Sequence, residues 1–139
     1  MEWLTYSYPL TIRFSDTDAY GIVHHSKYYC FFEEARYAFG ASIGAKDRFK
    51  GRGKIRFPVV HSSCDYRHPL VYDGKAVTVD LKCRVQAGCR IEFVYDIKKD
   101  GVVYAKGCTK HAVTEDDKLC IGAPWFDQEV ADIFGKEEK

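Results

Sequence analysis

One aromatic helix among strand-like segments constrains the fold of this chain more than any other feature. From Ser26 onward the apolar residues recur every three or four positions, as Tyr28, Phe31, Phe32, Ala35 and Phe39. This spacing places them on one broad face of a helix. Ser26 is a candidate N-cap, and Gly40 or Gly44 can end the helix. A face this aromatic has to be covered by other elements of the fold.

The segments around the helix alternate apolar and polar residues, which is the pattern of half-buried strands. The expected strands are 8–14, 57–67, 75–85, 89–99 and 102–115, with a short one near 119–121. Asp100-Gly101 is typical of a tight hairpin turn. We therefore expect an α+β fold in which an antiparallel sheet of about five to six strands wraps around one long central helix.

The length of 139 residues indicates a single domain over 1–139, with its core at about 8–122. A C-terminal helix is expected at about 124–134, because Pro124 suits a first helical turn. The outer face of the expected sheet is mixed in character, so a domain of this size is expected to pair with a copy of itself.

Charge and hydropathy argue against a nucleic-acid-binding protein and against a membrane protein. The net charge is +1, so no strong field draws the whole chain to nucleic acid or to an anionic membrane. No apolar run approaches the roughly 20 residues that a bilayer span needs, and the N-terminal segment lacks a leader pattern. We expect a cytoplasmic protein without membrane insertion. Its six cysteines are scattered without a C-x-x-C pair, so we expect reduced thiols rather than a disulfide framework.

Ionisable groups gather where the first strand gives way to the helix. Asp16 and Asp18 precede Gly21, and His24 and His25 directly precede the helix. A helix N-terminus presents backbone N–H groups that can hold an oxyanion, and a nearby carboxylate can act as base or nucleophile. One acid suffices for this chemistry, and the other can cap a turn. A solvated polar loop is the alternative.

Other site types are less well supported. The two acids and two histidines are acceptable metal ligands, but D-x-D followed by H-H is not a recognised metal spacing, so no metal is expected. No G-x-S-x-G nucleophile motif and no GxxxxGK phosphate loop occurs, and GRGK at 51–54 is interpreted as a solvated loop.

Residues 13–36, RFSDTDAYGIVHHSKYYCFFEEAR, closely resemble the opening motif of the 4-hydroxybenzoyl-CoA thioesterase family, which includes the Tol-Pal-type acyl-CoA thioesterases. DYRHPLVYDG at 65–74 is similar to the second family signature, an aromatic residue followed by x-x-P-[LA]-x-x-[GD]-[DE]. The resemblance implies a hotdog fold, in which an antiparallel sheet wraps a long helix. It also implies dimers whose sheets join, often paired into tetramers, with active sites at the dimer interface.

The resemblance implies roles for individual residues. Asp18 matches the catalytic carboxylate, which attacks the thioester carbonyl or activates water. The backbone N–H at His25 matches the oxyanion donor, and the His25 side chain can add a proton-handling role. Glu33 matches a position that holds a substrate-contacting acid in the benzoyl-specific member, with a structural role as the alternative. The implied substrate-binding residues are Tyr20, Gly21, Val23, Glu33, Val60, His61 and Arg90.

Departures from the family pattern concern the acyl group more than the reaction. Phe14 stands where several members have tyrosine, Tyr20 replaces a small residue, and His24 replaces a common aromatic residue. FPVVHSSCDY at 57–66 is similar to members that act on aromatic or dihydroxynaphthoyl thioesters, where His61 and Ser63 could contact a polar ring. Core-facing strand positions explain these two residues equally well.

The expected activity is therefore hydrolysis of an acyl-CoA, aromatic or short-chain, without metal or organic cofactor. Cations that could hold the CoA phosphates are Arg90, Lys106, Arg84 and Lys82, although all could be solvated charges on the sheet. The alternatives are a hotdog protein that binds thioesters without turnover, one directed to an acyl carrier protein, and an interaction scaffold. Residues 27–44 contain no histidine, which disfavours a dehydratase-like relative.

Overall fold

A computed structural model describes residues 3–45, 51–86 and 90–120 of the chain. The long helix forms where the aromatic spacing predicts it. α1 (Lys27–Ser42) buries the five apolar residues of the predicted face. Gly44 has a φ of +67° and its backbone N–H donates to the carbonyl of Ala41, so the helix ends at one of the two expected glycines. The C-terminal helix expected at 124–134 lies outside the described residues.

The start of α1 differs from the prediction. Ser26 has helical dihedral angles and its side chain makes no cap hydrogen bond. Instead, the imidazole Nδ1 of His24 accepts the backbone N–H of Ser26 at 3.2 Å, and lies 2.8 Å from the Ser26 hydroxyl. The Ser26 side chain thus contacts the His24 ring and does not cap the helix, and the first helical N–H groups, of Lys27 and Tyr28, donate to the carbonyls of His24 and His25 at 2.9 and 3.4 Å.

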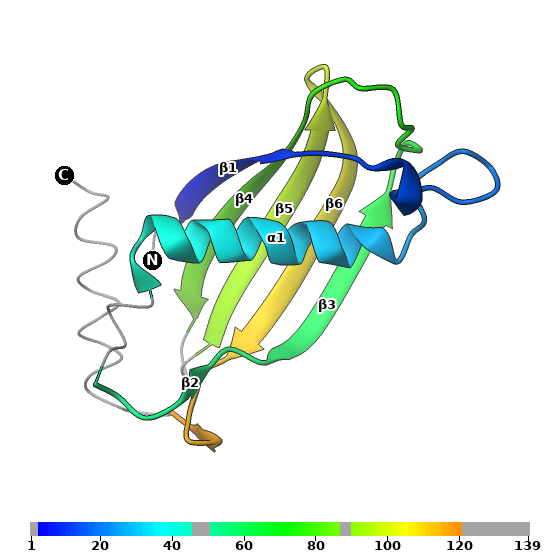
Figure 1. Cartoon of the computed structure of the whole chain (residues 1–139). Coiled ribbons are helices and arrows are strands. Elements are labelled where there is room, and N and C mark those ends of the chain that lie inside the picture. The colour runs from blue at the N-terminus through cyan, green and yellow to red at the C-terminus, as the bar shows by residue number, and fades with distance from the viewer. Residues whose placement is uncertain (1–2, 46–50, 87–89, 121–139) are drawn as a thin grey trace.

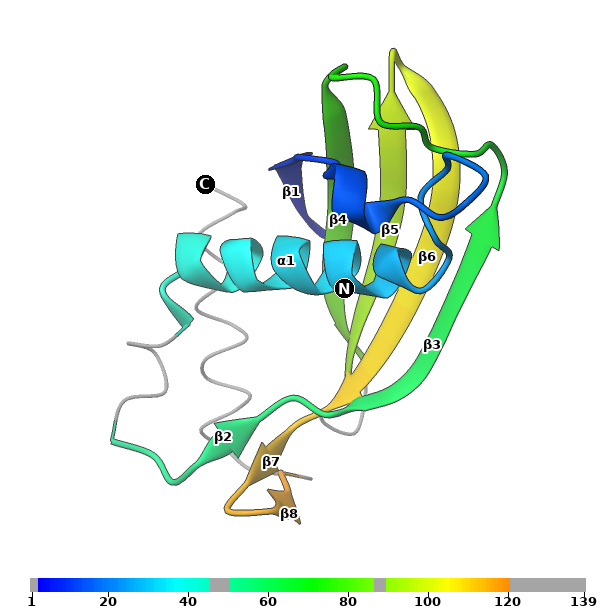
Figure 2. The ribbon, with the colours of Figure 1, turned by 45° about the vertical axis from the view of Figure 1, so that its right-hand side comes forward.

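A five-stranded antiparallel sheet wraps around α1, as expected (Figure 1). Its order is β1-β4-β5-β6-β3, with bounds β1 (Leu4–Leu10), β4 (Val77–Gln86), β5 (Arg90–Lys99), β6 (Val102–Ala112) and β3 (Val59–Tyr66). Asp100 (φ +53°) and Gly101 (φ +74°) form the predicted tight turn between β5 and β6. Figure 2 shows β6 and β3 bending around the helix. It also shows a small sheet beyond their lower ends, made of β2 (Ile55–Arg56), β7 (Thr114–Glu115) and β8 (Lys118–Leu119).

The first strand is displaced from its predicted position at 8–14. β1 pairs with β4 from Leu4 opposite Cys83 to Leu10 opposite Val77. Because β4 begins at Val77, β1 has no partner strand beyond Leu10 among the residues that the structure describes. Phe14, which the alternation pattern placed in the strand, instead begins the short 3-10 turn η1 (Phe14–Asp16) and its side chain is 75% exposed.

A glycine in β6 lets the helix approach the sheet closely. The ring of Phe32 stacks on Tyr95 with centroids 4.3 Å apart, and both side chains are fully buried. A Cβ built on Gly107 would lie 2.4 Å from the Phe32 ring, which is far inside van der Waals contact. The missing side chain at Gly107 is therefore the space that the Phe32 ring occupies.

A chain of buried hydrogen bonds links the helix to the segment before β3. Arg36 donates to the Tyr95 hydroxyl at 3.1 Å, and that hydroxyl lies 2.6 Å from the Thr109 hydroxyl. Thr109 in turn lies 2.9 Å from Nε2 of His111, and His111 Nδ1 lies 2.9 Å from the Phe57 carbonyl. Because a carbonyl only accepts, Nδ1 carries the proton and each member donates to the next. The neutral imidazole satisfies this chain.

The described residues contain no helix long and apolar enough to cross a bilayer. Five cysteines fall within them, and none of the five forms a disulfide: Cys30, Cys64, Cys83, Cys108 and Cys120. The edge strand β3 is largely exposed, with Val59 at 49% and Val60 at 51%. This open edge bears on how the chain assembles.

Candidate active site

The segment between η1 and α1 folds as a small hairpin that carries Asp18 and leads into the helix N-terminus. Thr17 and Val23 form an antiparallel bridge, and the backbone N–H of Asp18 donates to the carbonyl of Ile22 at 2.9 Å. The turn closes where the Gly21 N–H donates to the Asp18 carbonyl at 3.0 Å. Gly21 has a φ of +77°, which explains why glycine occupies this position.

The two aspartates of the D-x-D motif each accept one backbone N–H from a nearby residue. Asp16 Oδ2 accepts the backbone N–H of Arg13 at 2.9 Å, so this carboxylate stabilises the η1 turn. Asp18 Oδ1 accepts the N–H of Tyr20 at 2.8 Å, whereas its Oδ2 accepts no hydrogen bond from any described residue. Each aspartate thus stabilises a local turn with one oxygen and keeps the other available, so the choice of Asp18 over Asp16 rests on the family motif and stays a prediction.

His25 presents a free backbone donor beside the first turn of α1. Its neighbours on both sides are bonded: His24 donates its N–H to the Asp16 carbonyl at 2.9 Å, and Ser26 donates to the His24 ring. The N–H of His25 meets no acceptor among the described residues. The His25 ring is exposed and lies against that of His24, with centroids 4.3 Å apart. An unpaired N–H at a helix N-terminus is well suited to bind a developing negative charge.

Tyr66 contacts the candidate site, although no role was predicted for it. Its hydroxyl donates to the backbone carbonyl of His25 at 3.3 Å, and its ring stands edge-on to Tyr28 at 4.8 Å. Desolvation and the neighbouring Cys64 raise the pKa of Tyr66 to about 12, so the hydroxyl keeps its proton. The only signal in the sequence is that Tyr66 is the aromatic residue that opens the second signature.

The second signature packs directly against the first. The N–H of Val23 donates to the Leu70 carbonyl at 2.8 Å, and Ile22 forms an antiparallel bridge with Val71. Leu70 is fully buried, and the exposed ring of Tyr72 meets Phe14 edge-on at 6.2 Å. The loop from 67 to 75 therefore forms the support on which the Asp18 hairpin rests.

The structure separates the sequence-predicted residues into two groups. Tyr20, Gly21 and Val23 belong to the Asp18 hairpin, where Tyr20 is 87% exposed and Val23 is buried in the core. Val60 and His61 stand at the other end of β3, six residues before Tyr66, or about 20 Å along a strand. A single chain therefore does not bring Val60 and His61 to Asp18.

The remaining predicted residues lie on other elements. Glu33 is exposed on α1, one helical turn before Arg36. Arg90 is the first residue of β5 and pairs with Ala112, at the end of the sheet away from the Asp18 hairpin. Among the candidate CoA-binding cations, Arg84 pairs with Glu92 at 3.0 Å and Lys106 pairs with Asp96 at 3.2 Å. Lys82 and Arg90 form no ion pair with any described residue.

The site offers a carboxylate and a hydrogen-bond donor rather than a metal-binding cluster. In the described part of the chain, no three or more His, Cys, Asp or Glu side chains are grouped to hold a metal ion. The Asp18 oxygen can act as base or nucleophile, and the His25 N–H can bind an oxyanion. Together these are the two groups that acyl transfer requires.

Residues 12–133 match the thioesterase-like superfamily. A 1,4-dihydroxy-2-naphthoyl-CoA hydrolase from Synechococcus sp. (strain CC9902) is 35% identical over 111 residues, covering 74% of this chain and 72% of the relative. A hypothetical protein from Aquifex aeolicus has a crystal structure with a TM-score of 0.73 at 33% identity, covering 91% of this chain and 98% of that one. A 1,4-dihydroxy-2-naphthoyl-CoA thioesterase from Synechocystis shares the fold, with a TM-score of 0.77 at 21% identity over 92% of this chain and 96% of that one.

Proposed function

The chain belongs to the thioesterase-like superfamily, and we propose that it hydrolyses the thioester of an acyl-CoA to the free acid and CoA. One observation carries this proposal. A single hairpin holds a carboxylate with an unpaired oxygen, on Asp18, and leads directly to an unpaired helix-terminal N–H, on His25. The family match and the hydrolases among the relatives support thioester hydrolysis as the reaction.

The proposed reaction uses only groups of this chain. The thioester carbonyl oxygen accepts a hydrogen bond from the His25 N–H. Asp18 either attacks the carbonyl carbon, giving an acyl-enzyme that water hydrolyses, or removes a proton from the water that attacks. The C–S bond breaks and CoA leaves as a good leaving group, so one base and one oxyanion donor suffice. Tyr66 holds the carbonyl of His25 and thereby keeps the oxyanion donor in place.

An aromatic acyl group is the substrate class that we favour. Relatives named for 1,4-dihydroxy-2-naphthoyl-CoA support this choice. The chain itself adds aromatic surface near the hairpin: Tyr66 is 47% exposed and Tyr20 is 87% exposed. Exposed aromatic side chains at a site can stack on a planar acyl group.

We further propose that the working enzyme is a dimer joined along β3, able to pair again into a tetramer, in the cytoplasm. The edge of β3 offers unpaired backbone groups to a second strand. Antiparallel pairing of two β3 strands would set the start of one beside the end of the other. Val60 and His61 of one copy would then approach Tyr66 and the Asp18 hairpin of the other. This arrangement accounts for predicted substrate contacts that a single chain keeps about 20 Å apart.

The proposal is tested by hydrolysis of a panel of aromatic, short-chain and long-chain acyl-CoAs. Loss of thioester absorbance should be followed, because exposed thiols such as Cys30 would react with a thiol dye. We expect turnover that is greatest for aromatic acyl groups. Absence of turnover on every acyl-CoA, with the protein folded and dimeric, would contradict it. Activity on acyl carrier protein substrates alone would move the proposal to that carrier.

Dimerisation has its own test. Sedimentation should give a dimer or tetramer for the wild type. Ser62→Pro, which removes a backbone donor from the middle of the exposed β3 edge, should shift the protein toward monomer and lower turnover. A monomeric wild type with full activity would contradict the shared site.

A further inference from the structure

The loop from 67 to 75 supports the Asp18 hairpin. The first two residues of this loop are hydrogen-bonded to β6 of the β5–β6 hairpin. The pairing of β5 with β6 shifts between Ile97 and Lys98, which leaves Tyr104 without a cross-strand partner on β5. The carbonyl of Tyr104 accepts the backbone N–H groups of Arg67 at 2.9 Å and His68 at 3.1 Å. The β-bulge thus turns one carbonyl toward the loop.

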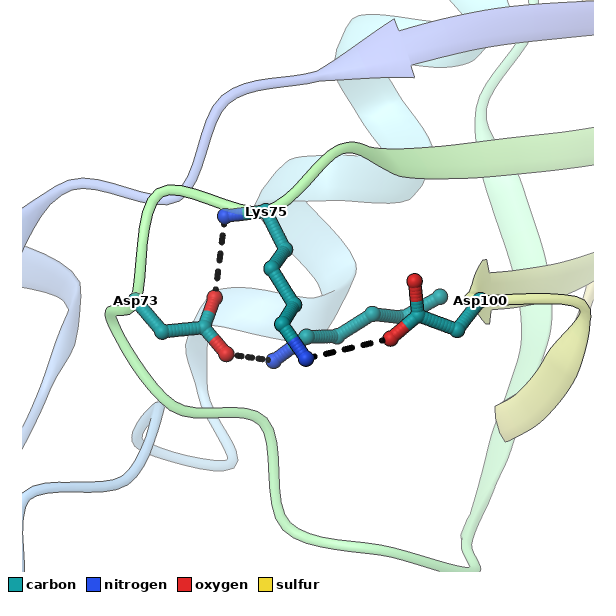
Figure 3. Close-up of polar contacts among 4 residues, drawn as sticks. Asp73, Lys75 and Asp100 are labelled. Carbon is teal, nitrogen blue, oxygen red and sulfur yellow. Dashed lines mark hydrogen bonds and ion pairs between the residues drawn. The ribbon is translucent and has the colours of Figure 1, made fainter.

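The loop is held near its end by an ion pair with a buried lysine. Lys99 Nζ lies 2.5 Å from Asp73 Oδ2, and the Lys99 side chain is 4% exposed. The other carboxylate oxygen of Asp73 accepts the backbone N–H of Lys75 at 3.0 Å, as Figure 3 shows. The hydrogen bond from Lys99 is the largest cause that lowers the pKa of Asp73. A lysine this buried needs such a partner, because an unpaired buried charge is costly.

A neighbouring ion pair provides a contrast within the same cluster. Lys75 Nζ lies 3.4 Å from Asp100 Oδ2, and these side chains are 59% and 64% exposed (Figure 3). Solvent screens such a pair, which therefore contributes little. Two Lys–Asp pairs thus lie side by side, one with a buried lysine and one with both side chains exposed.

The Lys99–Asp73 pair is connected to Asp18 through backbone contacts. Asp73 follows Val71 by two residues, and Val71 forms the antiparallel bridge with Ile22. The carbonyl of Ile22 accepts the N–H of Asp18 at 2.9 Å. Within the same loop, Leu70 accepts the N–H of Val23. A shift of the loop relative to the sheet would therefore move the hairpin that carries Asp18.

We propose that the Lys99–Asp73 ion pair is a positioning device for the Asp18 carboxylate, acting through the loop at 67–75. Neither side chain needs to touch the substrate. The inference rests on the proposed function, because it assumes that Asp18 carries the reaction. A misplacement of about 1 Å at a reacting group can cost about 100-fold in rate, so a remote clamp can matter to turnover.

The decisive variant is Lys99→Met. Methionine retains much of the apolar stem and removes the buried charge, and Asp73 is exposed enough to stand alone, so the variant is expected to fold. We expect kcat to fall about 10- to 100-fold with KM within about threefold of wild type. Lys99→Arg keeps the charge and should recover most of the activity. Asp73→Asn should resemble Lys99→Met.

Lys75→Met and Asp100→Asn are the matched controls, and both should retain kcat within about twofold, as expected for an exposed pair. Wild-type kcat in folded Lys99→Met would overturn the proposal. So would an equal loss in Lys75→Met, since the effect would then belong to the charge cluster in general. If Lys99→Met does not fold, full activity in Asp73→Asn would overturn the proposal.

Amide hydrogen exchange gives a second readout that does not depend on turnover. Loss of the clamp should speed exchange at the N–H groups of Asp18 and Val23, which donate to Ile22 and Leu70, whereas Lys75→Met should leave them protected. Unchanged protection in Lys99→Met would overturn the coupling even if the enzyme proved inactive on every substrate. Wild-type turnover that Asp18→Asn abolishes but Lys99→Met does not would overturn this inference and leave the proposed function standing.

Discussion

The hydroxyl of Tyr66 donates a hydrogen bond to the backbone carbonyl of His25 across 3.3 Å. Tyr66 ends the exposed edge strand β3, and His25 precedes the first turn of α1. The contact therefore ties the strand proposed to join two copies to the residue proposed to hold the oxyanion. Assembly and catalysis would share this link.

Tyr66→Phe should lower kcat about three- to tenfold, because one hydrogen bond worth about 0.5–1.5 kcal/mol is lost from the support of His25. The ring contact with Tyr28 is kept, so stability should change little. Steady-state kinetics on the best substrate measures the effect. Tyr37→Phe is the control, since Tyr37 lies on α1, the helix of Tyr28, and is 82% exposed. Equal kcat in Tyr66→Phe and wild type would show that this link has no role in turnover.

Gly107→Ala should destabilise the fold by about 1–3 kcal/mol, because the added methyl group would be forced against the Phe32 ring. Urea unfolding followed by circular dichroism measures the change. Gly40→Ala is the control: its added Cβ meets only Ala45 at 3.8 Å, and alanine favours a helix interior. This control should be neutral or stabilising. Wild-type stability in Gly107→Ala would contradict the tight helix–sheet contact.

His111 should make stability depend on pH. Burial is the largest cause that lowers the pKa of His111 below its ordinary 6.5, and the Arg36 charge adds to it. The folded chain keeps the ring neutral while the unfolded chain takes up a proton near pH 6.5. The free energy of unfolding should therefore fall as pH drops through 6.5, by at most about 1.4 kcal/mol per pH unit.

His111→Gln tests this expectation, since an amide can donate to the Phe57 carbonyl and accept from Thr109 in place of the ring. Urea unfolding of both proteins between about pH 7.5 and 5.5 should show a smaller decline for the variant. Parallel declines would show that His111 is not the group that titrates.

The sequence predicted the helix and most strands because their periodicity depends on local burial. The predicted bounds of the first strand were wrong for a physical reason. The same alternation of apolar residues runs through Leu4, Tyr6, Tyr8 and Leu10 and on to Ile12 and Phe14. Periodicity alone cannot show where pairing begins or stops. The pairing of β1 ends at Leu10 because β4 begins at Val77, and this end depends on how distant segments pair rather than on the local sequence.

Only part of the candidate site could be predicted from the sequence. Residue types and the family motif predicted Asp18 and His25, and these roles stay predictions, because the structure engages both Asp16 and Asp18 in local turns. The Lys99–Asp73 pair joins residues 26 positions apart, and the chain through Tyr95 and His111 crosses three elements. Such contacts depend on how strands and loops meet in space, and no local pattern predicts them.

The most direct test of the account compares Asp18→Asn with Asp16→Asn on the best acyl-CoA. Both changes remove one negative charge from the same motif and keep the size of the side chain. We expect kcat to fall at least about 1000-fold in Asp18→Asn, because a base or nucleophile is lost. Asp16→Asn can still accept the Arg13 N–H, so it should stay within about tenfold of wild type. Full activity in folded Asp18→Asn, or a larger loss in Asp16→Asn, would contradict the assignment of Asp18 as the catalytic carboxylate.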